Sequence, residues 1–85
     1  MKNKPAKTPS AERLHPGVFI AEELVARNWT VDDLVNRGRF ARYRWETLIG
    51  GRRLTMLDAF ELSNLFGTGH EFWINLQKIY DGKQT

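Results

Sequence analysis

The sequence carries one helix-start signal three times, and this repetition constrains the fold more than any other feature. A Thr followed three residues later by Asp or Glu forms a capping box, in which each side chain accepts a hydrogen bond from the other residue's backbone N–H. The three boxes run from Thr30 to Asp33, from Thr55 to Asp58 and from Thr68 to Glu71. Apolar residues at helical spacing follow each box, so each one predicts the start of a helix.

Proline and glycine residues mark other helix ends. Pro16 predicts the start of a first helix that ends near Asn28, and glycines at 38, 50, 51 and 67 are expected to stop later helices. The predicted helices are 16–28, 31–37, 42–49, 56–66 and 70–80. No segment alternates with a period of two, so we expect no strand.

The 85 residues are enough for one small core. Residues 1–13 are polar, contain two prolines and lack periodicity, so we expect a mobile basic arm there. The fold class predicted for residues 14–85 is an all-α, five-helix domain.

The last three predicted helices supply most of the expected core. Trp45, Leu48 and Ile49 are expected to face inward from the third helix, and Ala59, Phe60, Leu62, Ser63 and Phe66 from the fourth. The last helix carries an apolar stripe that serves either the core or a dimer. Because so small a domain hides little apolar surface, we expect a homodimer. Its expected interface is Phe72, Trp73, Leu76 and Ile79.

The positive charge is concentrated in one stretch. Residues 37–53 hold six arginines and one acid, for a net charge of +5, whereas the other 68 residues sum to −2. A guanidinium group is planar and can donate two parallel hydrogen bonds, which suits it to bind phosphate or the edge of guanine. We interpret this stretch as a nucleic-acid-binding surface, with a solvated arginine-rich surface as the alternative.

The predicted helices 31–37 and 42–49 are joined by four residues, which are the dimensions of a helix-turn-helix. In that motif the second helix enters the major groove of double-stranded DNA. The expected base contacts come from Arg42, Tyr43, Arg44, Glu46 and Thr47. The expected phosphate contacts come from the flanking loops, through Arg39, Arg52 and Arg53.

Several groups of residues resemble the HigA-type antitoxins, a branch of the phage-repressor-like helix-turn-helix proteins. They are His15-Pro16-Gly17, Trp29-Thr30, the turn from Gly51 to Thr55, Ala59 and Leu62, the run from Phe72 to Gln77, and Tyr80-Asp81. The resemblance spans about His15 to Asp81. It implies a five-helix domain, usually homodimeric, that represses its own operon and often pairs with a small ribonuclease toxin.

The chain departs from this family in the turn. The family has Leu-Gly-Val-Ser in this turn, and this chain has Gly38-Arg39-Phe40-Ala41. The Ser or Thr that would cap the predicted helix 42–49 is therefore missing, which costs about 1 kcal/mol of stability. Two hypotheses follow. The first is a DNA-binding repressor of antitoxin type that binds a palindromic operator as a dimer. The second is a protein-interaction module of the same fold that neutralises a toxin or another protein without reading DNA.

Other function classes lack the residues they need. The chain has no Cys, and His15 and His70 are not at metal-ligand spacing, so we expect no metal and no cofactor. His15 is expected instead to fix the start of the first helix. No Ser has a candidate base nearby, so we expect no enzyme. No apolar run approaches the roughly 18 residues of a membrane span, and we expect a cytoplasmic protein without membrane contact.

Overall fold

The computed structural model describes residues 14–84, and in that range the chain forms five helices and no strand. The helices are α1 (Pro16–Arg27), α2 (Val31–Arg37), α3 (Arg42–Ile49), α4 (Met56–Phe66) and α5 (His70–Gln84). The predicted helices are confirmed, except that α5 continues four residues beyond Tyr80. The expected basic arm, residues 1–13, lies outside the described residues.

Two of the three predicted capping boxes are confirmed. Thr30 and Asp33 cap α2, and Thr55 and Asp58 cap α4, with both reciprocal bonds present in each box. The third box is wrong, because α5 begins at His70 and Gly69 precedes it. The Thr68 hydroxyl instead accepts a hydrogen bond from Trp73 Nε1 at 2.7 Å.

The start of α1 rests against the end of α3. His15 caps α1, as expected, and its Nδ1 accepts the backbone N–H of Gly17 at 2.8 Å. A Cβ atom at Gly17 would lie 2.5 Å from the carbonyl oxygen of Ile49 and 2.6 Å from that of Leu48. Only glycine therefore allows the two backbones to approach this closely.

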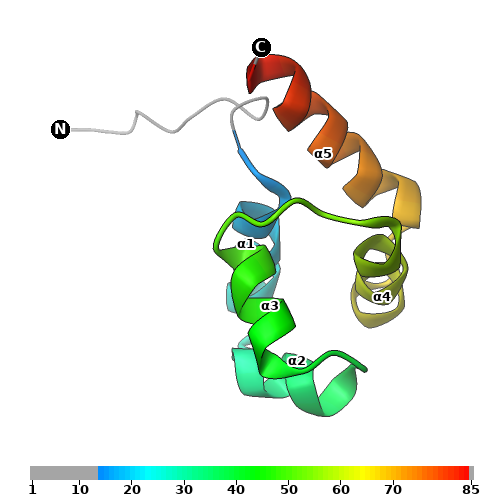
Figure 1. Cartoon of the computed structure of the whole chain (residues 1–85). Coiled ribbons are helices and arrows are strands. Elements are labelled where there is room, and N and C mark those ends of the chain that lie inside the picture. The colour runs from blue at the N-terminus through cyan, green and yellow to red at the C-terminus, as the bar shows by residue number, and fades with distance from the viewer. Residues whose placement is uncertain (1–13, 85) are drawn as a thin grey trace, which may run out of the picture.

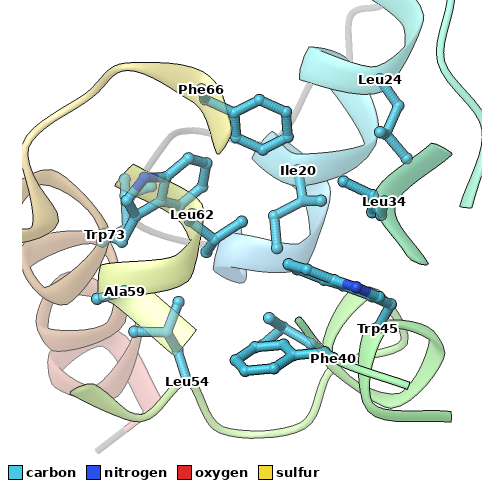
Figure 2. Packing of buried hydrophobic residues seen from close by; sticks show 12 residues of the cluster. Ile20, Leu24, Leu34, Phe40, Trp45, Leu54, Ala59, Leu62, Phe66 and Trp73 are labelled. Carbon is cyan, nitrogen blue, oxygen red and sulfur yellow. The ribbon is translucent and has the colours of Figure 1, made fainter. Parts of the chain in front are cut away.

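The helices form two groups around one core. Helices α1, α2 and α3 lie together, α4 packs on α5, and the segment 50–55 crosses from one group to the other (Figure 1). Figure 2 shows Ile20 of α1 pointing into the centre of the apolar cluster, with Trp45 and Phe40 side by side below it. The buried hydrophobic residues are Ile20, Leu24, Leu34, Phe40, Trp45, Leu48, Leu54, Ala59, Leu62, Phe66, Trp73 and Leu76.

Some expected core positions differ in the structure. Phe60 is exposed on the outer face of α4, where its ring packs 4.6 Å from the ring of His70. Helix α4 turns Asp58 and Glu61 inward instead, two acids that apolar periodicity does not mark as core residues.

Candidate nucleic-acid interface

The turn between α2 and α3 is shaped by a buried acid on α4. Glu61 is buried, and its Oε2 accepts the backbone N–H of Arg39 at 2.6 Å. A Cβ atom at Gly38 would lie 2.5 Å from the same oxygen, so glycine leaves room for the carboxylate. Phe40 then turns into the core, with its ring centroid 4.9 Å from that of Trp45.

Helix α3 begins without a side-chain cap. Its N-cap residue, Ala41, has extended backbone angles and makes no capping hydrogen bond from its side chain. Trp45 and Leu48 hold the helix to the core from its inner face. The outer face presents Arg42, Tyr43 and Glu46, which are all exposed, and Tyr43 keeps 76% of its surface in solvent.

Arg44 lies at the edge of this face, and its guanidinium group bends toward α4. Its Nε and Nη2 lie 3.2 and 3.1 Å from Oδ1 of Asp58, and Nη2 also donates to the hydroxyl of Thr55 at 3.4 Å. The guanidinium carbon lies 4.4 Å from the centre of the Phe40 ring. Arg44 is thus held by an ion pair and a cation–π contact within the protein.

Arg52 is bound still more completely. Its Nη1 and Nη2 donate to the two Asp58 oxygens at 2.9 and 3.2 Å. The same nitrogens donate to the carbonyl oxygens of Arg53 and Arg44, and Nε donates to the hydroxyl of Thr47. All five donors of the guanidinium group have partners, so Arg52 joins α3, the following turn and α4. The sequence predicts a phosphate contact for Arg52, and in the structure its guanidinium group has these internal partners.

The centre of the cluster is the carboxylate of Asp58, which is 0% exposed. Burial alone raises the pKa of this group, but hydrogen bonds from Arg52 and Thr55 outweigh burial and hold the pKa below its ordinary value. Asp58 therefore stays ionised and balances part of the charge of Arg44 and Arg52.

Acids from other parts of the chain also meet the basic stretch. Arg42 pairs with Asp32 of α2 and lies 3.9 Å from Glu46, and Arg53 pairs with Asp81 of α5 at 2.6 Å. With Asp58 included, four acids accompany the six arginines, which leaves about +2 on this side of the molecule. The other two arginines, Arg37 and Arg39, have exposed side chains without an ion pair among the described residues, although Arg37 lies 4.2 Å from the Trp29 ring.

Helix α5 anchors the segment after α3. Gln77 is buried, and its Oε1 accepts the backbone N–H of Leu54 at 2.8 Å, while its Nε2 donates to Asp81 at 2.9 Å. The pKa of Asp81 lies below its ordinary value because Gln77 and Arg53 both donate to its carboxylate. His15 lies beside this network with its ring 5.2 Å from that of Tyr80, and burial lowers the pKa of His15.

The structure splits the apolar stripe expected at a dimer interface. Trp73 and Leu76 lie in the core of the single chain, so they are not surface residues. Phe72 and Ile79 remain exposed, at 44% and 45%. The sequence pattern indicates Asp58 only as a capping residue and does not indicate Glu61, because a charged residue on a helix gives no linear sign of burial.

Between residues 14 and 84, no helix is long and apolar enough to cross a membrane. The same residues contain no cluster of three or more His, Asp or Glu side chains that could hold a metal ion.

Comparison with solved structures identifies a family to which the chain is similar. No model of a protein family matches the chain, and no curated protein matches it either. Among solved structures, the chain is similar to an addiction module antidote protein of the HigA family from Coxiella burnetii. The two share 35% sequence identity and a TM-score of 0.78, over 85% of this chain and 80% of that one.

This likeness, together with the five-helix fold, defines an antitoxin of the toxin–antitoxin type. The chain belongs to the HigA family.

Proposed function

We propose that this antitoxin is a cytoplasmic repressor that binds a palindromic DNA operator as a homodimer and inserts α3 into the major groove. The observation that carries the proposal is the exposed outer face of α3. It follows a four-residue turn after α2, as in a helix-turn-helix, and it presents Arg42, Tyr43 and Glu46 to solvent.

The proposed contacts are fewer than the sequence suggested. Arg42 and Glu46 can bond guanine and cytosine edges, and Tyr43 can pack against a thymine methyl group or donate to a phosphate. In this proposal the exposed side chains of Arg39, which precedes α3 in the chain, and Arg53, which follows it, bind phosphates.

Three residues of the sequence-based set receive supporting roles in this proposal. Arg44 and Arg52 are bound to Asp58. Thr47 is half-buried, and its hydroxyl donates to the carbonyl of Arg44 and accepts from Arg52. In this proposal Arg52 and Thr47 fix the position of α3, Arg44 stays bound to Asp58, and the exposed side chains bind DNA.

A homodimer in this proposal uses the exposed part of α5. Phe72 and Ile79 are seven residues apart and lie on one side of the helix, where two copies can pack against each other. Trp73 and Leu76 support that surface from beneath. Binding to a palindrome then requires the two α3 helices to lie about 34 Å apart, one turn of the duplex.

The experiment is a mobility-shift titration on the DNA upstream of the gene, repeated on random duplex at several salt concentrations. If Arg39 and Arg53 of each subunit bind phosphates, a dimer releases about four counterions, and log K falls against log salt with a slope of about −4. Arg42→Ala is expected to weaken operator binding by about 1–3 kcal/mol and to relax sequence preference.

Lys78→Ala is the matched control, because it removes one exposed positive charge from α5. Equal loss of operator binding in Lys78→Ala and Arg42→Ala would refute the assignment of α3 as the reading helix.

A second candidate function is a module that neutralises a partner, such as a small ribonuclease toxin, without reading DNA. The observation that favours it is the pairing of four of the six arginines with acids, beside an α3 that lacks a side-chain cap. Absence of binding to any duplex at low salt, with retained binding to a co-expressed toxin, would favour this candidate.

A further inference from the structure

Arg42 and Arg44 lie near the start of the same helix, but their ion pairs differ in how exposed the acidic partner is. The partners of Arg42, Asp32 and Glu46, are more than half exposed, so water can solvate them when Arg42 leaves. Exposed pairs of this kind are weak and exchange readily with a phosphate. The partner of Arg44 is the fully buried carboxylate of Asp58, which cannot follow Arg44 to the surface.

Moving Arg44 onto DNA would therefore remove one of the two positive charges that neutralise a buried anion. It would also remove the cation from the face of Phe40. Arg52 is fixed in addition by three bonds that do not involve Asp58, to Thr47 and to two backbone carbonyls. Of the two arginines, Arg44 thus depends more on Asp58 for its position.

We infer that Asp58 is a specificity-determining residue: it holds Arg44 away from DNA phosphates and leaves the choice of sequence to Arg42, Tyr43 and Glu46. The inference rests on the proposed DNA binding. An additional phosphate contact strengthens binding to every sequence alike, whereas a held Arg44 keeps the affinity for random DNA low. A buried acid in the capping box of α4 thereby limits non-specific binding.

The test compares the wild type with Asp58→Asn, Arg44→Gln and the double variant on a random duplex across a range of salt. Asp58→Asn keeps the shape of the side chain and removes its charge. For each Arg44 that this change releases, we expect binding to random duplex to become roughly tenfold tighter at about 0.1 M salt. With two subunits, the slope of log K against log salt is expected to become steeper by about 2.

Arg44→Gln alone is expected to bind random duplex within about twofold of the wild type, and the double variant is expected to lose the gain of Asp58→Asn. Arg42→Gln is the matched control, because it removes the same charge two residues away and is expected to weaken binding. An equal loss in Arg44→Gln and Arg42→Gln would overturn the inference. So would a folded Asp58→Asn protein with the affinity and slope of the wild type.

Two further measurements distinguish an unfolded variant, or a protein that does not bind DNA, from an incorrect inference about Asp58. Circular dichroism shows whether Asp58→Asn is folded, and if it is not, the comparison of Arg44→Gln with Arg42→Gln decides alone. Labelling of arginines with phenylglyoxal, read by mass spectrometry, needs no DNA. In the wild type, Arg44 is expected to react about tenfold more slowly than Arg42. In Asp58→Asn, the two arginines are expected to react at similar rates. A wild type that binds no duplex refutes the proposed function and the role of Asp58 on DNA, while the labelling still reports whether Asp58 holds Arg44.

Discussion

Substitution of Gly17 tests the contact between α1 and α3 on which the position of the candidate reading helix depends. In Gly17→Ala the new methyl group would meet the carbonyl oxygens of Ile49 and Leu48 at 2.5 and 2.6 Å. Ordinary contact begins near 3.4 Å, so α1 must move away from α3 by nearly 1 Å. Both obstacles are backbone atoms, and no side-chain rotation relieves them.

The expected loss of stability follows from two opposing effects. Overpacking that shifts a helix costs about 3 kcal/mol, at the upper end of the usual range, because the Ile20 and Trp45 contacts loosen together. The higher helix propensity of Ala returns up to about 1 kcal/mol. The net loss of about 2 kcal/mol is a substantial part of the roughly 4–12 kcal/mol typical of a domain this size.

The assay is urea unfolding followed by tryptophan fluorescence at one fixed protein concentration, because dimerisation would make stability depend on concentration. Gly82→Ala is the matched control, since a Cβ atom there meets nothing within 4 Å and Ala favours the helix. We expect Gly82→Ala to be as stable as the wild type or slightly more so. A Gly17→Ala protein within about 0.5 kcal/mol of the wild type would show that the two backbones are not in close contact.

Three further predictions concern single hydrogen-bonding groups. Burial lowers the pKa of His15, so the unfolded chain binds this proton at a higher pH than the folded chain does. Stability is therefore expected to fall as the pH drops from about 6.5 through the lowered pKa. The His15→Asn variant keeps a capping group and should show a smaller fall in the urea midpoint between pH 7.5 and 5. Ala41→Ser should supply the missing cap of α3 and raise the free energy of unfolding by about 1 kcal/mol, and an unchanged midpoint would contradict this. Thr68→Val leaves Trp73 Nε1 without its partner and should cost about 1–3 kcal/mol by thermal unfolding, whereas Thr68→Ser should cost much less.

Helix limits were predictable here because their causes are local. A capping box at Thr30 or Thr55 involves residues three apart, and the stop at Gly67 requires the positive φ of 77° found there. Thr68 departs from the pattern, because its hydroxyl accepts a hydrogen bond from the indole of Trp73, five residues further along in the first turn of α5. The same sequence pattern therefore gave a different structure, because a nearby indole donates to the hydroxyl that would have capped the helix.

The sequence shows where the arginines lie along the chain, but the charge that their ion pairs leave was not predictable. The pairing of Arg44 and Arg52 with Asp58 joins residues 14 and 6 positions apart, and the pair of Arg53 and Asp81 joins residues 28 apart. Such pairs depend on how α3, α4 and α5 are stacked, which no periodicity encodes. The burial of Trp73 and the exposure of Phe72 likewise depend on which side of α5 meets α1 and α4.

The three tryptophans give the molecule three distinct optical reporters. Trp29 is half-buried, and the guanidinium carbons of Arg27 and Arg37 lie 5.7 and 4.2 Å from the centre of its ring. Trp45 is fully buried in α3 and its Nε1 has no hydrogen-bond partner among residues 14–84, whereas Trp73 is buried in α5 with Nε1 bonded to Thr68. Single-tryptophan variants would therefore emit from surroundings of three different polarities, so that a change at α3, at α5 or beside α2 could be followed separately and without an added dye.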